Sequence, residues 1–349
     1  MKKSLIALAV LAATGGASAQ SSVTVYGIVD AYAGSTKDTT GAAGNNAKST
    51  TAQSQSVLNS GGLKSNRWGL RGSEDLGNGL KATFKLEQRF KSDDGSLDSV
   101  NFKGESSVGL SGGFGAVLLG RTTTVYDDLR DLTNPIGDTN LSPVIDAIKE
   151  AKGDYVDTTD NTIAYRSPVI GGFSGGLTLS LGENKTSTVD ATQHTALKLQ
   201  YANGPLLVGY AYQNEESQNG APAGINDVTY HLLAGSYDFG VAKLVGGYQN
   251  ADRKTVGAKT GDDSVYYFGV SAPVAKDVNL YFGYVNSEFD AVAANGDVKA
   301  TGYTIAANYW LSKRTDLYAG YKQIKKKNDN SGADLGKISQ LAVGVRHSF

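Results

Sequence analysis

The chain of 349 residues has no cysteine and only six prolines, one methionine and three histidines. The absence of cysteine excludes a secreted scaffold held together by disulfides, and also a thiolate metal site. The histidines, His194, His231 and His347, stand in no HExxH or Ser-x-x-His context. A metal site is therefore not indicated, and a hydrolase, which needs a histidine beside its nucleophile, is disfavoured.

Long apolar runs and an excess of positive charge are missing as well. The run from Leu5 to Ala13 is too short for a transmembrane helix, which needs about 20 apolar residues, so a helical membrane protein is excluded. This run follows Lys2 and Lys3 and precedes Ala17-Ser18-Ala19, so we expect residues 1–19 to be a secretory signal peptide. Removing Lys2 and Lys3 from the 33 basic residues leaves 31 against 34 acidic ones, a balance that excludes nucleic acid as a partner.

The chain is instead rich in glycine and tyrosine, with 44 and 19 residues, and it shows a strict alternation. Over residues 80–91 the even positions are mostly apolar, whereas the odd positions carry lysine, threonine, glutamate and arginine. Successive side chains of a strand point to opposite faces, so this segment has one apolar face and one charged face. The same rhythm recurs in 278–284 and 303–311. Lipid satisfies no free backbone group, so such strands must close into a ring.

Short turns alternate with long polar loops along the chain, and both can be counted. The turns are expected at 75–79, 112–115, 168–173, 203–205, 238–240, 273–277 and 312–315. The loops are expected at 35–62, 92–101, 123–160, 183–192, 214–226, 251–263, 289–298 and 327–335. Seven turns and eight loops join sixteen strands, so we predict an all-β fold: a 16-stranded antiparallel transmembrane β-barrel formed by residues 20–349 as a single domain.

The last strand ends on an aromatic residue. Leu341, Val343 and Val345 share its apolar face with the terminal Phe349, and this strand is predicted to close the barrel against residues 23–33. It resembles the C-terminal strands by which barrel-assembly machinery recognises its clients, so Phe349 is predicted to be an assembly signal.

Over essentially the whole mature chain the sequence resembles the sixteen-stranded trimeric general porins of Gram-negative outer membranes. The resemblance is carried, in order, by Ser22 to Asp30, Arg67 to Gly77, Leu119-Gly120-Arg121, Tyr165 to Pro168 and Gly344 to Phe349. It implies short periplasmic turns, long external loops, a homotrimer in outer-membrane lipid and lipopolysaccharide, and a third loop (123–160) that folds inward and narrows the pore. Small hydrophilic solutes and ions would then cross by passive diffusion, with no cofactor.

Alternation places a row of charged side chains on the lumen side of the second and third strands. The residues expected at the pore constriction are Arg67, Arg71, Lys85, Glu87, Arg89 and Arg121 of the wall and Asp127, Asp128 and Asp131 of the acidic third loop. Of these, Arg67 and Glu87 match constriction positions in similar porins. An acidic lip facing a basic wall creates a transverse field. Because Gly104-Glu105 stands where some anion-selective relatives carry paired basic residues, we expect weak selectivity of undetermined sign.

Two other functions stay open on the same barrel, a substrate-specific channel and an adhesin, and an outer-membrane hydrolase is much less favoured. A sugar channel would show a track of lumen aromatics, and Tyr26, Tyr32 and Tyr281 do not form one. The run Lys325-Lys326-Lys327 lies at the base of the eighth loop. It is either the solvated margin of that loop or a contact for lipopolysaccharide phosphates.

Overall fold

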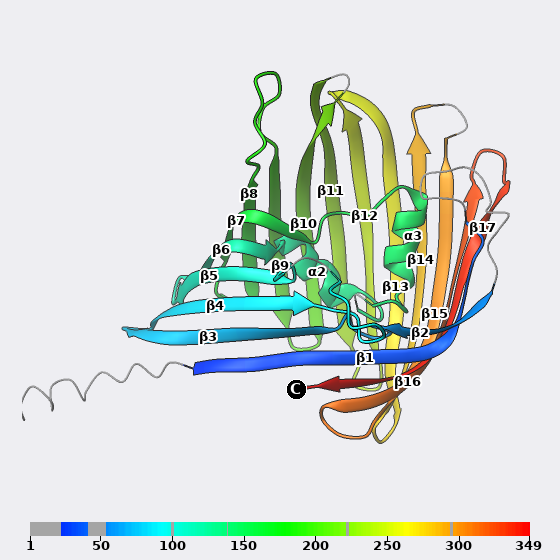
Figure 1. Ribbon diagram of the computed structural model, residues 1–349, viewed down its shortest axis with the longest axis horizontal. Coiled ribbons are helices and arrows are strands. Elements are labelled where there is room, and N and C mark those ends of the chain that lie inside the picture. The colour runs from blue at the N-terminus through cyan, green and yellow to red at the C-terminus, as the bar shows by residue number, and fades with distance from the viewer. Residues whose placement is uncertain (1–21, 41–53, 99–100, 138, 221–222, 294–295) are drawn as a thin grey trace, which may run out of the picture.

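The computed structural model describes residues 22–40, 54–98, 101–137, 139–220, 223–293 and 296–349. The expected signal peptide, residues 1–19, lies outside these ranges. The described chain forms one antiparallel sheet in which consecutive strands pair, except that β2 and β3 both pair with β1 and not with each other, and β1 also pairs with β17. The sheet is thus closed into a barrel whose interior holds two short helices (Figure 1).

The first nine strands are β1 (Ser22–Asp38), β2 (Gln55–Ser60), β3 (Arg67–Gly77), β4 (Leu80–Arg89), β5 (Glu105–Gly112), β6 (Gly115–Thr123), β7 (Thr158–Arg166), β8 (Phe173–Leu181) and β9 (Gln193–Asn203). The other eight are β10 (Leu206–Gly220), β11 (Ala223–Asp238), β12 (Lys243–Thr255), β13 (Ala258–Ala275), β14 (Val278–Ala291), β15 (Val298–Trp310), β16 (Thr315–Asn328) and β17 (Asp334–Ser348). The helices α2 (Val125–Thr133) and α3 (Pro143–Ala151) lie between β6 and β7.

Strands β2 and β3 are two halves of one wall strand. Both pair with the same edge of β1, β2 with its residues 31–36 and β3 with its residues 22–28. Between them the Asp30 carboxylate accepts hydrogen bonds from the backbone N–H groups of Gly62, Leu63 and Lys64 at 3.2, 2.8 and 2.8 Å. Counted in this way, the seventeen strand segments form a 16-stranded barrel, which confirms the predicted fold class.

The seven predicted turns all connect consecutive strands, but three of the predicted loops are longer than the connections in the structure. The 35–62 loop was wrong at both ends, since β1 continues to Asp38 and β2 occupies 55–60. The loops at 214–226 and 251–263 shrink to short connections after Gly220 and Thr255. Polar residues had suggested loops there, but the ladders continue to Gly220–Ala223 and Thr255–Ala258, because strand pairing depends on backbone hydrogen bonds and not on apolar side chains.

Alternation correctly predicts which side chains face outward. On β17, Leu341, Val343 and Val345 are exposed on the outer face, whereas Gln340 and Ala342 are buried on the inner one. Near the short turns, exposed aromatic rings pair on the outer wall, for example Tyr237 with Phe239 at 4.6 Å between ring centroids. Such rings suit the boundary between hydrocarbon and water.

The third loop contains helices that the sequence analysis did not anticipate. Thr124 caps α2 through its side-chain oxygen, which accepts from the Asp127 N–H, and Pro143 begins α3. Both are favoured residues at a helix start. The apolar faces of the two helices are buried with inward side chains of the wall in one cluster. In the described part of the chain, neither helix is long and apolar enough to cross a membrane.

Candidate pore constriction

Two lysines of β16 fix helix α3 of the third loop to the wall. On α3, Asp146 accepts from the ammonium of Lys322, and Glu150 lies 3.5 Å from that of Lys326. Both lysines are inward residues of β16 and almost fully buried. Burial raises the pKa of Glu150 even though Lys326 acts in the opposite direction. Helix α3 is thus held by charge pairs in addition to its apolar face.

Glycines in the wall allow the third loop to approach closely. An added Cβ at Gly269 would lie 2.2 Å from the Pro135 Cβ, and one at Gly209 would lie 2.7 Å from Leu129. Interiors are close-packed, so neither site has room for a larger side chain. The small residues of the inner wall therefore determine how far the loop stands from it.

The acidic groups of the loop are mostly paired. Asp128 accepts from the Arg166 guanidinium at 2.9 Å and lies 3.7 Å from the Lys198 ammonium, while Asp131 lies 3.7 Å from that of Lys64. Asp127 accepts from the hydroxyl of Tyr155, whose pKa burial raises well above its usual range. The predicted acidic lip is therefore largely compensated by cations of the wall.

On the opposite wall, three of the predicted basic residues surround the carboxylate of Glu87. Its carboxylate lies 3.3 Å from Arg67 and 3.8 Å from both Lys85 and Arg89, and it accepts from the Tyr26 hydroxyl at 3.0 Å. The Glu87 side chain is only 4% exposed. It therefore presents little charge to the lumen, and it holds its neighbours in place.

Loop and wall face each other across a hollow of about 390 Å³, which is called the passage below. Its charged lining residues are Lys64, Arg67, Arg89 and Lys198 together with Asp127, Asp128, Asp131 and Asp157. Five of the nine predicted constriction residues thus meet here, and cations and carboxylates are equal in number. A second hollow beside the first is lined by Arg89, Arg130, Asp127, Asp146 and Lys149, among others.

Arg71 and Lys85 lie further along the same wall. They are cross-strand neighbours on β3 and β4, and both line a different hollow together with Glu105. The Lys85 ammonium donates to Glu105 at 2.6 Å, and Arg71 lies over the Tyr26 ring at 5.0 Å. The structure thus places these two predicted residues beside the narrow passage and not in its lining.

Arg121 is not among the residues that line the passage. Its guanidinium donates to Asp160 at 2.9 Å and to the Lys103 carbonyl at 2.8 Å. In the register, Arg121 pairs with Ser106, two positions beyond the pairing of exposed Leu119 with exposed Val108. Its residue position therefore belongs to the outer face of the wall.

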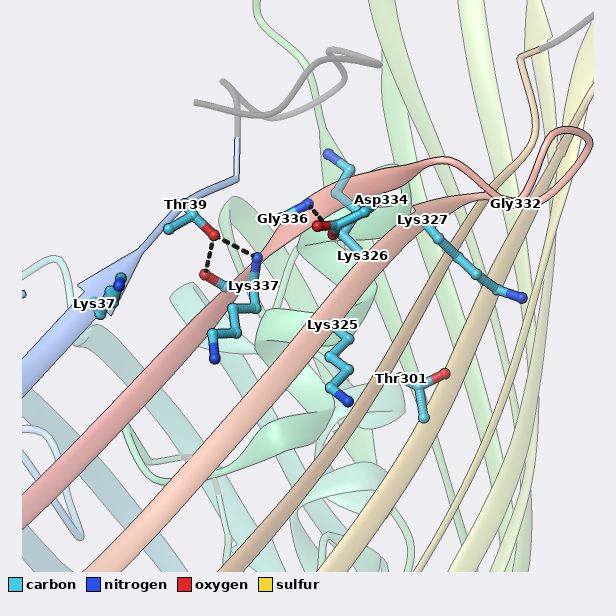
Figure 2. A pocket seen from close by; sticks show the side chains of 10 residues that line it. All are labelled: Lys37, Thr39, Thr301, Lys325, Lys326, Lys327, Gly332, Asp334, Gly336 and Lys337. Carbon is cyan, nitrogen blue, oxygen red and sulfur yellow. Dashed lines mark hydrogen bonds between the residues drawn. The ribbon is translucent and has the colours of Figure 1, made fainter. Parts of the chain in front are cut away.

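The sequence analysis did not assign the wall cations Lys64, Lys198 and Lys322, and it placed Lys326 with Lys325 and Lys327 (Figure 2) at the base of the eighth loop, whereas Lys326 is buried beside Glu150. A signal was present, because Lys198 stands between the exposed Leu197 and Leu199, and Lys322 and Lys326 follow the inward rhythm of β16. What the sequence did not reveal is which loop carboxylate each one meets. Asp138, another acid of this loop, lies outside the described residues.

Comparison with known proteins gives concordant matches. The family model described as "Gram-negative porin" matches residues 5–329. The Delftia acidovorans outer membrane porin protein 32 is 36% identical over the full length of both chains, and a Neisseria meningitidis major outer membrane protein P.IB is 30% identical, again over both full lengths. The solved structure of an anion-selective porin from Comamonas acidovorans aligns with a TM-score of 0.80 at 32% identity, covering 94% of this chain and 100% of that one.

Proposed function

The chain belongs to the Gram-negative porins, and we propose that its third loop and basic wall together form the constriction of a water-filled outer-membrane channel. A barrel of sixteen strands is too wide to be filled by its own side chains, so small solutes diffuse through it unless a segment blocks it. The observation that carries the proposal is the charged passage between the loop and β3–β4, open inside a closed ring.

The proposed roles follow from position. Arg67, Arg89, Asp127, Asp128 and Asp131 line the narrow passage, and permeating solutes meet their charges directly. Arg71 and Lys85 act on ions in the adjoining hollow. Glu87 keeps Arg67, Lys85 and Arg89 in place as a positioning residue. Arg121 has no role at the constriction in this assignment.

We propose only weak ion selectivity. Four cations and four carboxylates line the passage, so its summed charge is close to zero while its two sides differ in sign. Such a field orients dipolar solutes without strongly favouring one ion. The Comamonas acidovorans relative is described as anion-selective. We therefore expect the small remaining preference to favour anions, because Arg67 and Arg89 line the passage.

Conductance in planar bilayers tests the channel. The purified protein is expected to give ohmic, stepwise openings, and a KCl gradient is expected to give a reversal potential near zero or weakly on the anion side. A protein that inserts without conducting would refute the proposal. A reversal potential close to the ideal value for one ion would refute weak selectivity alone.

We also propose that the chain is a homotrimer. Polar and aromatic groups beside the short strands support this. Arg121 of β6 and Asp160 of β7 form an ion-pair cluster with Lys103, and Trp68 of β3 packs against Phe102, where Lys103 and Phe102 belong to the connection between β4 and β5. A lipid-facing position disfavours charge, whereas a protein contact accommodates it. Light scattering in detergent, corrected for bound detergent, should give three times the chain mass. Barrel-assembly machinery, reading Phe349, and outer-leaflet lipopolysaccharide are the further partners we propose.

A further inference from the structure

The connection between β2 and β3 is longer than the wall requires. Ser60, the last residue of β2, pairs with Ala31, and Arg67, the first residue of β3, pairs with Ile28. Six residues, 61–66, therefore stand opposite only two residues of β1. Paired strands advance by about the same 3.3 Å per residue, so the surplus cannot stay in the plane of the wall. Residues 61–66 form a protrusion, which is called the β2–β3 bulge below.

The β2–β3 bulge turns into the barrel. Leu63 is buried, and it shares one apolar cluster with Leu141 of the third loop and Tyr318 of β16. The Leu141 N–H also donates to the Gly62 carbonyl at 3.2 Å. The bulge therefore packs against the third loop inside the barrel, on the side of β1 and β16.

The carboxylate of Asp30 holds the β2–β3 bulge in this position. It accepts from three successive backbone N–H groups, those of residues 62–64, at 2.8 to 3.2 Å, and also from the hydroxyl of Tyr318. The backbone of Asp30 adds two further contacts, since its N–H donates to the Asn66 side chain and its carbonyl accepts from the Gly61 N–H. Successive N–H groups that converge on one anion form a concavity shaped by that anion. The conformation of the bulge is thus tied to one fully buried side chain.

The β2–β3 bulge carries a positive charge into the passage. Lys64 lines the passage together with Arg67 and Arg89, and its ammonium lies 3.7 Å from the Asp131 carboxylate. The neighbouring Ser65 lines the second hollow, and its carbonyl accepts from the Arg67 guanidinium at 3.2 Å. Lys64 belongs to no strand, so no strand register fixes the direction of its side chain. Its place in the passage depends on the bulge.

We propose that Asp30 is a positioning residue for ion selectivity, which holds the β2–β3 bulge so that the Lys64 ammonium stays in the passage. This inference rests on the proposed channel function. Asp30 accepts from the Lys64 N–H at 2.8 Å, while its own side chain is buried and does not line the passage. It therefore acts on permeating ions through Lys64.

The sign of the effect separates positioning from charge alone. Loss of the negative charge of Asp30 by itself would favour anions in the passage. Displacement of the Lys64 ammonium would instead favour cations. A purely structural role of Asp30 would lower stability and leave the selectivity of the folded channels unchanged.

Reversal potentials in a KCl gradient at low salt test the proposal on the full-length protein. The permeability ratio of chloride to potassium is expected to fall about twofold in Lys64→Gln and at least about 1.5-fold in Asp30→Ala. Asp30→Asn removes the same charge but keeps one acceptor oxygen, so its fall should be smaller than that of Asp30→Ala. The double variant Asp30→Ala/Lys64→Gln should show no further fall relative to Lys64→Gln, because Asp30 then has no charge to position.

Asp316→Ala is the matched control. Asp316 is a fully buried inward carboxylate of β16, and its hydrogen bonds go to Arg346 and Asn308, not to the β2–β3 bulge. Its replacement removes the same charge as Asp30→Ala without releasing Lys64. The control is therefore expected not to lower the permeability ratio.

Three results would overturn the proposal: an unchanged or raised ratio in Asp30→Ala, a further fall of the same size in the Lys64→Gln background, or an equal fall in Asp316→Ala. If Asp30→Ala does not fold, Asp30→Asn takes its place in each comparison. A parent protein that inserts without conducting would refute the channel itself. The permeability ratios are measured in conducting channels, so they decide the role of Asp30 alone.

Discussion

Arg130 and Asp154 form a bidentate ion pair inside the third loop, with Nη1–Oδ1 and Nη2–Oδ2 distances of 2.6 and 3.0 Å. The pair ties α2 to the segment that follows α3, and the Arg130 side chain is 3% exposed. The guanidinium also lies over the Tyr155 ring at 4.5 Å. The loop therefore has an internal clasp in addition to its contacts with the wall.

Replacing Asp154 with alanine should loosen this clasp. The buried guanidinium would lose both of its carboxylate hydrogen bonds, which is expected to lower the free energy of unfolding by about 3 kcal/mol. Single-channel recordings should also show noisier open states. The matched control is Asp190→Ala, which breaks an exposed pair with Lys185 and should change stability by less than about 1 kcal/mol. Equal behaviour of the two variants would contradict a structural role for the clasp.

Removing charge at Arg67 and at Arg121 should have different effects on selectivity. Arg67 lines the passage, so Arg67→Ala is expected to shift the permeability ratio of chloride to potassium downward by about two- to fivefold at low salt. Arg121→Ala is expected to leave it unchanged, because this guanidinium pairs with Asp160 away from the passage. Reversal potentials in a KCl gradient measure both. A larger shift for Arg121→Ala would show that the assignment is wrong.

A larger residue at Gly269 should move the third loop. The Cβ of Gly269→Val would collide with Pro135, and overpacking of this kind costs about 1 to 3 kcal/mol. Because the loop can yield only into the lumen, single-channel conductance should fall. Gly113→Ala is the control, since an added Cβ there meets nothing within 4 Å. A Gly269→Val channel with parental conductance and stability would mean that the loop is not seated as described.

Glu150 should make a pH-dependent contribution to stability. Burial raises its pKa in the folded protein, so the folded state binds this proton more tightly than the unfolded chain. The contribution is complete below the unfolded pKa of about 4.3 and is lost as pH rises through the raised value. The melting temperature of the parent minus that of Glu150→Gln should therefore be smaller at pH 8 than at pH 4. A difference that does not vary with pH would exclude this effect.

Phe349 should matter more for assembly in cells than for folding. Barrel closure at this residue uses its backbone, since Phe349 and Gly27 exchange two hydrogen bonds of 3.0 Å, and Phe349 as a whole is 46% exposed. Phe349→Ala should therefore refold in detergent nearly as well as the parent but reach the outer membrane several-fold less. Val343→Ala, on the same outward row, serves as the control. A severe refolding defect in Phe349→Ala would favour a purely structural role.

The face of most wall residues could be predicted from the sequence. The side-chain period of a strand is two, so Leu341 and Val343 had to share one face and Arg67 and Arg71 another. The same rule places Arg121 in one row with Val117 and the exposed Leu119, so its expected position at the constriction was wrong. Polar strand ends were mistaken for loops because alternation fades where both faces meet water.

The sequence by itself determined a ring of sixteen strands, apolar outside and polar inside. Backbone N–H and C=O groups in lipid must be hydrogen-bonded, which closes the ring, and successive side chains point to opposite faces of each strand, which separates apolar from polar residues. Only the tertiary structure decided which charges meet. The partners of Asp146 and Glu150 are Lys322 and Lys326, some 176 residues away, and β1 at the start of the described chain pairs with β17 at its end. No local pattern encodes such pairs, since they depend on the closure of the ring and on the fold of the third loop within it.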